Sequence, residues 1–142
     1  MRVVLGMLAL IVGAIGLIGQ LVSAVDFRLA QRLGLQEKDE GTDPLYRRLE
    51  LHAARWDVIV LWTLPVAGIL MLLDHRWWPS AGLLAGGINL DAGGREVAKI
   101  LGLRAEGVRV GTRREARAGL VAITILALLG LGLGAYSLTV LL

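Results

Sequence analysis

Four long apolar stretches fill most of the chain, and they restrict its possible folds more than any other feature. Val3–Val25 runs for 23 residues without a charge, and Ala118–Leu142 continues uncharged to the last residue. Between them, Val58–Leu73 and Trp77–Leu90 form a close pair. A helix needs about 20 residues to cross a hydrocarbon core of roughly 30 Å. The outer two stretches reach this length, and the middle two reach it when flanking Trp and Arg residues lie in the interface.

This pattern predicts an all-α membrane protein with four transmembrane helices in an antiparallel bundle. A hydrophobic fraction of 56% is higher than soluble domains of this size carry. We expect one integral membrane domain over residues 1–142. Its predicted spans are 3–25, 56–74, 77–101 and 117–142, and its predicted cytoplasmic loops are 26–55 and 102–116.

The first stretch also has features of a secretory signal peptide. Arg2 precedes the apolar run, and Val22, Ser23 and Ala24 offer a small-residue cleavage site. The run is longer than the usual apolar core of a signal peptide, which spans about 7–15 residues. A retained first helix is therefore the favoured interpretation, and cleavage is the alternative.

The positions of lysine and arginine predict the orientation. One precedes the first stretch, six lie between the first and second, one lies between the second and third, and seven lie between the third and fourth. Cytoplasmic loops are enriched in these cations, so both termini and the short turn around His75 are predicted to lie outside. The expected location is the cytoplasmic (inner) membrane of a prokaryote.

Several residues predict where helices begin and end. Asp43 followed by Pro44 is typical of a helix start, because Asp caps free amides and Pro loses nothing at the first position. This start gives the second span a cytoplasmic extension, whose face with Leu45 and Leu49 we expect to pack on the third loop, a partner or lipid. Thr112 and the glutamate three residues later fit a capping box for the fourth helix. We expect the first helix to continue to Gly34.

Small residues at four-residue spacing predict close packing between helices inside the membrane. Such spacing lets backbones approach where lipid supplies no hydrophobic force between helices. The pairs are Ala9 and Gly13, Gly82 and Gly86, and Gly130 and Gly134. Pro65 lies near the middle of the second span and predicts a kink there.

A polar layer near the cytoplasmic side is the candidate site. The third span carries Asn89, Asp91 and Arg95, and Asp91 lies about 21 Å along the helix from its outer end. Gln20 and Asp57 fall at a similar depth on the first two spans. Asp91 and Arg95 are four residues apart, so we expect them to form an ion pair.

Two roles remain open for this layer. A buried polar clasp could fix helix register or meet lipid headgroups, and this interpretation is favoured because a counter-ion is built in. The alternative is a pathway for an ion, a proton or a small molecule, which acids inside membranes often mark.

A basic collar is predicted at the cytoplasmic ends of the helices. Its members, expected to face lipid, are Arg47, Arg48, Arg109, Arg113, Arg114 and Arg117. Cations in this position bind anionic headgroups with roughly 1 kcal/mol each. Nucleic-acid binding is not expected, because these cations lie at a membrane end without interleaved aromatic residues.

The sequence predicts neither a cofactor nor a metal site. There is no cysteine, and the two histidines, His52 and His75, lie outside the membrane core. The leading functional hypothesis is a non-enzymatic accessory or assembly subunit of a larger membrane complex, or a small homo-oligomer. Its expected partners are membrane lipids and other membrane subunits or copies of itself.

Two other functions are weighed against the leading one. The first alternative is a small transporter or channel with a polar site around Asp91 and Arg95. The second is an intramembrane enzyme acting on a lipid-like substrate, which would use Asp91 with Asp57 or Glu96.

Overall fold

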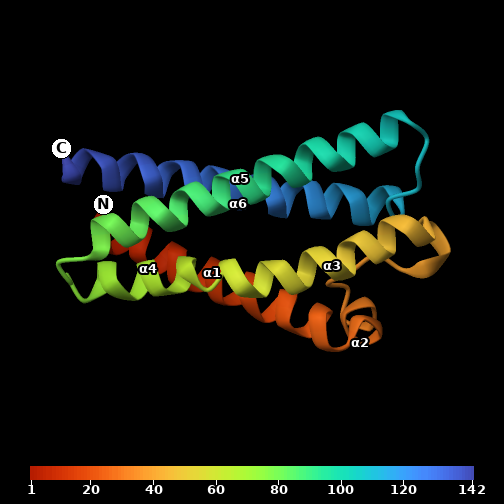
Figure 1. Ribbon diagram of the computed structural model, residues 1–142, viewed down its shortest axis with the longest axis horizontal. Helices are drawn as coiled ribbons and strands as arrows, with labels where there is room; N and C mark the ends of the chain where they lie inside the picture. Colours follow the sequence, from red (N-terminus) through yellow and green to blue (C-terminus); the bar gives the residue numbers. More distant parts are fainter.

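The chain folds into helices joined by loops, as the predicted all-α class requires. The computed structural model describes all 142 residues, of which 82% are helical, and it contains no strand. In chain order the helices are α1 (Arg2–Val25), α2 (Phe27–Arg32), the short 3-10 helix η1 (Asp39–Gly41), α3 (Pro44–Val60), α4 (Thr63–Leu72), α5 (Trp78–Ala105) and α6 (Arg113–Leu141) (Figure 1).

Three helical segments are long and apolar enough to cross a membrane, which indicates membrane association. They are α1, α6 and the combined length of α3 and α4 over Pro44–Leu72. Helix α5 has 28 residues, but from its midpoint onward it carries several charged side chains, Asp91 and Lys99 among them. By length and composition alone it is not a fourth span, so the four-span count and the orientation stay predictions.

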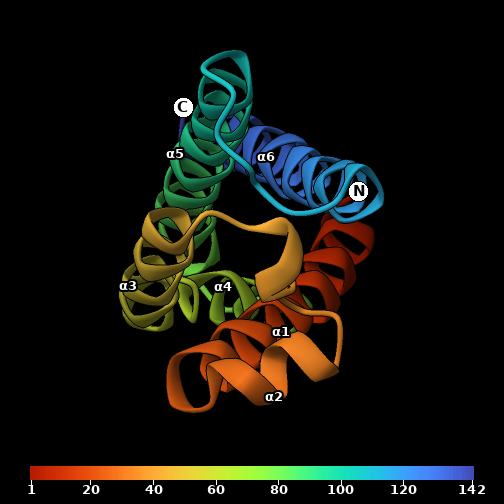
Figure 2. The ribbon, with the colours of Figure 1, turned by 90° about the vertical axis from the view of Figure 1, so that its right-hand side faces the viewer.

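The long helices run side by side, so the molecule has two distinct ends (Figure 1). Both chain termini and the turn at residues 73–77, between α4 and α5, lie at one end, here named the turn end. Residues 26–43, which include α2 and η1, and residues 106–112 lie at the other, the loop end. Seen from the loop end, the helices form a ring in the order α1, α3 with α4, α5 and α6 (Figure 2).

The predicted caps at the loop end are confirmed. The Asp43 carboxylate accepts a hydrogen bond from the Leu45 amide at 2.8 Å, and Thr112 begins α6 with a complete capping box. The expected continuation of the first helix is wrong, because α1 ends at Val25. Asp26 instead caps the separate helix α2, and a side-chain oxygen that satisfies new amide groups favours such a break.

The predicted kink at Pro65 appears as a break in the helix. Helix α3 ends at Val60 and α4 begins at Thr63, two residues before the proline. The ring of Pro65 excludes a hydrogen bond to the Leu61 carbonyl and crowds it. Two side chains satisfy carbonyls freed at the break: Thr63 Oγ1 donates to Val60 at 2.8 Å, and Trp62 Nε1 donates to Ile59 at 2.7 Å.

Close packing at small residues is confirmed in both helix pairs. In α5 and α6, a Cβ atom added to Gly86 would lie 2.6 Å from the Gly134 amide nitrogen, and one added to Gly130 would lie 2.7 Å from the Leu90 amide nitrogen. In α1 and α4, a Cβ added to Gly68 would lie 2.6 Å from the Leu10 nitrogen. Backbone therefore meets backbone at both crossings, as membrane helix pairs with small residues do.

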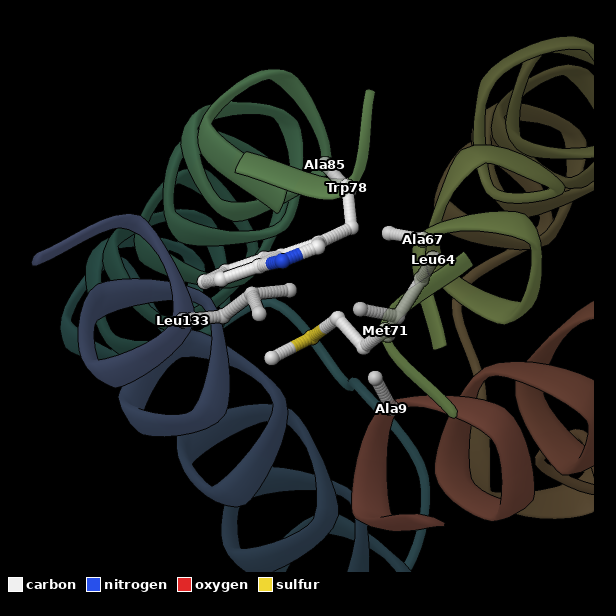
Figure 3. Packing of buried hydrophobic residues seen from close by; sticks show 7 residues of the cluster. All are labelled: Ala9, Leu64, Ala67, Met71, Trp78, Ala85 and Leu133. Carbon is white, nitrogen blue, oxygen red and sulfur yellow. The ribbon is translucent and has the colours of Figure 1, made fainter. Parts of the chain in front are cut away.

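An apolar core fills the half of the bundle nearer the turn end, and Figure 3 shows the packing of its side chains. The side chains of Leu64, Met71 and Leu133 are almost completely buried there, and Trp78 stacks on Tyr136 with ring centroids 5.6 Å apart. The core contains residues from α1, α4, α5 and α6. Close-packed side chains thus close this half of the molecule.

The two loop segments at the loop end are joined to each other. Thr42 and Val110 form an isolated antiparallel bridge, and the Asp43 amide donates to the Arg109 carbonyl at 2.8 Å. A small apolar cluster of Tyr46, Ile100 and Val110 lies directly beneath. The start of α3 is consequently held against α5 and the α5–α6 loop.

Candidate functional site

A polar cavity lies between the apolar core and the loop end. Its volume is about 310 Å³, near the lower limit for small-molecule sites. Residues from α1, α3, α5 and α6 line it, together with the loop residues Leu35–Glu37. The ionisable residues in its wall are Glu37, Tyr46, Glu50, Asp57 and Glu96.

Helix α3 places three of these residues on one face. Tyr46, Glu50 and Asp57 recur at intervals of four and seven residues, so they project toward α5 in line. The face predicted to pack, with Leu45 and Leu49, is instead exposed by 59% and 46%. This face is therefore not covered within the chain, and its contact with a partner or with lipid stays a prediction.

One lysine joins two of the carboxylates across the cavity wall. Lys99 Nζ lies 2.6 Å from Glu50 Oε1 and 2.6 Å from Glu96 Oε2. These side chains are mostly buried, with exposed fractions of 25% for Lys99, 15% for Glu50 and 28% for Glu96. The same ammonium lies 5.5 Å from the centre of the Tyr46 ring, within cation–π range. This triad connects α3 to α5.

Helix α1 contributes amide and hydroxyl groups to the opposite wall. Gln20 lines the cavity, and its buried Oε1 has no hydrogen-bond partner. Ser23 Oγ donates to the Gly19 carbonyl at 2.8 Å and accepts from Gln36 Nε2 at 3.2 Å. The wall that faces the triad therefore contains a buried amide oxygen without a hydrogen-bond partner.

The loop over the cavity holds Glu37 in a desolvated position. Burial raises the pKa of the Glu37 carboxyl above its usual value, and the nearby charges of Glu50 and Glu115 add to this effect. Beside it, hydrogen bonds from Arg47 and Gln31 hold the pKa of Asp39 below its usual value. Burial thus favours the neutral form of Glu37, whereas hydrogen bonds favour the charged form of Asp39.

The charges of the cavity do not balance. Four carboxylates, those of Glu37, Glu50, Asp57 and Glu96, surround it, and Lys99 is the one cation bonded to any of them. A cavity with an excess of acids attracts positive charge and repels anions.

The structure separates the five residues of the predicted polar layer. Gln20 and Asp57 both line the cavity. Asn89 is fully buried, and its Nδ2 donates to the Ala85 carbonyl at 2.8 Å while its Oδ1 lacks a partner. Asp91 and Arg95 form the expected ion pair at 2.9 Å, but their side chains are 65% and 61% exposed on the outer face of α5.

The predicted basic collar lies at the loop end. Arg47 pairs with Asp39 at 2.7 Å and is partly covered. The other five are exposed and form no ion pair, namely Arg48, Arg109, Arg113, Arg114 and Arg117. Their binding to anionic headgroups remains a prediction.

Two residues of the triad, Glu50 and Lys99, were not among the predicted site residues. The sequence does carry a signal for Glu50, because Tyr46, Glu50 and Asp57 share one helical face. Lys99 lies four residues beyond Arg95, in the same row as Asp91 and Arg95. A helix advances 400° over four residues, so such a row drifts, and here the drift turns Lys99 toward Glu50.

No family model matches this chain, and neither the curated proteins nor the solved structures compared with it give a match.

Proposed function

We propose that the protein is an integral membrane bundle of four spans, with α5 as the third span and both termini outside. The outward faces of the other spans are apolar, with Ile15 66%, Val121 61% and Leu128 62% exposed. Helix α5 is 28 residues long, about 42 Å at 1.5 Å per residue, and lies alongside the apolar helices. Most of the lysine and arginine residues lie toward the loop end, which supports a cytoplasmic location of that end.

Single cysteines test this topology, because the natural chain has none. His75→Cys lies just before α5 and Glu106→Cys just after it. In intact cells a membrane-impermeant maleimide should label the first fully and the second only after permeabilisation. Equal labelling of both positions before permeabilisation would show that α5 does not cross.

Within this bundle, we propose that the protein is a small transporter whose cavity binds a small organic cation. The excess of carboxylates over the single Lys99 ammonium carries the proposal. A volume of about 310 Å³ fits a small amine and excludes a large drug-like molecule. No three acids or histidines are grouped to hold a metal ion, which favours an organic cation with apolar surface.

The position of the cavity also supports binding from one side at a time. It lies toward the loop end, whereas the core around Leu64, Met71 and Trp78 closes the bundle toward the turn end. Leu61, at the break between α3 and α4, forms part of the cavity lining. Binding sites of transporters are typically formed where membrane helices are interrupted, and this break is such an interruption.

Uptake of radiolabelled tetraethylammonium into reconstituted vesicles tests this function. Asp57→Asn and Glu96→Gln should each lower the initial rate at least about tenfold, because each removes a charge worth roughly 1.4 kcal/mol or more to the bound cation. Glu106→Gln is the matched control, since Glu106 is exposed and lies outside the cavity, and its rate should equal that of the natural protein. Uptake no faster than in empty vesicles, or unaffected by the two cavity substitutions, would refute the proposal.

A second candidate function is the accessory or assembly subunit. One observation favours it, namely the exposed ion pair of Asp91 and Arg95 on the outside of α5. Charged groups in membrane helices face protein or water far more often than lipid.

A further inference from the structure

The outer face of α5 carries charge where the other helices carry hydrocarbon. Asp91 is the fourteenth of the 28 residues in this helix, so its pair with Arg95 lies near mid-length. Arg95 Nε bonds back to Asp91 Oδ2, so its side chain turns toward the helix N-terminus and away from the loop end. The guanidinium therefore stays at the level of the carboxylate, away from the nearer interface.

The pair uses only part of its hydrogen-bonding capacity. A guanidinium has five N–H donors and a carboxylate two acceptor oxygens. Arg95 donates one bond, from Nε, and Asp91 accepts it on Oδ2. The other donors of Arg95 and Oδ1 of Asp91 have no partner within the chain, which is costly in a medium without water.

The same face allows a neighbouring helix to come close. Gly87, Gly94 and Gly102 have open space where a Cβ atom would lie, and Ala98 is exposed between the last two. Gly94, Ala98 and Gly102 follow one another at four-residue spacing, which permits close backbone approach between membrane helices. None of the glycines that pack against α6, such as Gly86, belongs to this row.

We propose that this face of α5 binds the same face of a second copy of the chain, forming a two-fold symmetric dimer. Charge complementarity is the reason for choosing a second copy as the partner. In a two-fold pair with its axis along the membrane normal, equivalent residues lie at equal depth. Each Arg95 guanidinium then faces the partner's Asp91 carboxylate, so the free donors of one copy meet the free acceptors of the other. The inference rests on the proposed membrane span of α5 and is independent of the ligand in the cavity.

Oxidative cross-linking of a single cysteine in native membranes tests the dimer. Ala98→Cys lies on the proposed interface, and Val121→Cys is a matched control on the exposed face of α6. We expect a cross-linked dimer from the first variant and none above background from the second. Equal yields, or an adduct of Ala98→Cys with a different protein, would overturn the proposal.

The paired substitution Asp91→Leu with Arg95→Leu then tests how much the two charges contribute to the dimer. It removes both at once, so no unpaired charge is left and each copy should keep its thermal stability. The yield of Ala98→Cys dimer should fall at least about tenfold, the change expected from two interhelical contacts of ordinary membrane strength. An unchanged yield would contradict the role of the ion pair. Cation uptake in the dimer-deficient variant separates this result from the proposed transport function.

Discussion

Gly130→Ala is expected to lower the free energy of unfolding by about 2–3 kcal/mol, the upper part of the range for overpacking a close contact. The added methyl carbon would lie 2.7 Å from the Leu90 amide nitrogen and 2.8 Å from the Gly86 carbonyl oxygen. Both atoms belong to the α5 backbone and cannot rotate away as a side chain could. The helices must separate instead, so the change affects the whole α5–α6 pair. Denaturation in mild detergent, followed by circular dichroism, measures the loss.

Gly132→Ala provides the control for this prediction. Gly132 lies two residues further along α6 and has open space at the position of a Cβ atom. Both substitutions change helix propensity equally, so the difference between them reports the contact alone. Equal stabilities of the two variants would mean that the backbone approach at Gly130 is not required.

Lys99→Met is expected to destabilise the protein by about 3–5 kcal/mol, the usual cost of leaving partly buried charges without their counter-ion. Methionine keeps the length of the side chain and removes the ammonium that Glu50 and Glu96 share. Two carboxylates would then repel each other beside the cavity. Adding Glu50→Gln to this variant should recover most of the lost stability, since one charge and its repulsion disappear. The same detergent unfolding experiment applies.

Arg47→Met is the comparison for the lysine substitution. Arg47 also pairs with an acid, Asp39, at 2.7 Å, but their side chains are 43% and 58% exposed. Exposed pairs of this kind contribute about 0–1 kcal/mol. A loss as large as that of Lys99→Met would show that burial is not what makes the triad important.

The positions of the helices followed from the sequence because hydrophobic length and capping residues act locally. Asp43 and Thr112 begin helices where their side chains can accept amide hydrogen bonds, and Pro65 interrupts one because it lacks a donor. The pairs of small residues at four-residue spacing also predicted where the helices pack closely. The break at Asp26 was missed, since a capping side chain there competes with an equally feasible continuous helix. Because α5 carries several charged residues, its sequence alone does not decide whether it crosses the membrane as a fourth span.

The candidate site was harder to derive, because it depends on which face of each helix turns inward. Gln20 and Asp57 were selected for their depth, and depth was sufficient for both to reach the cavity. Asp91 was selected by the same argument, yet it lies on the outside of α5. Periodicity gives the relative angle between residues on one helix and leaves the helix's rotation against its neighbours undetermined. That rotation is set here by backbone contacts between α5 and α6, which bury Asn89 and leave Asp91 exposed.

The interruption between α3 and α4 gives the bundle a pivot. No backbone hydrogen bond runs from α4 back to α3, and the carbonyls of Ile59 and Val60 are already occupied by side chains of the next turn. A change of angle at Leu61 and Trp62 would therefore leave the hydrogen bonds inside α3 and inside α4 intact. The start of α3 is bonded to the α5–α6 loop and, through Glu50 and Lys99, to α5, so we expect a bend at the break to require the release of these contacts.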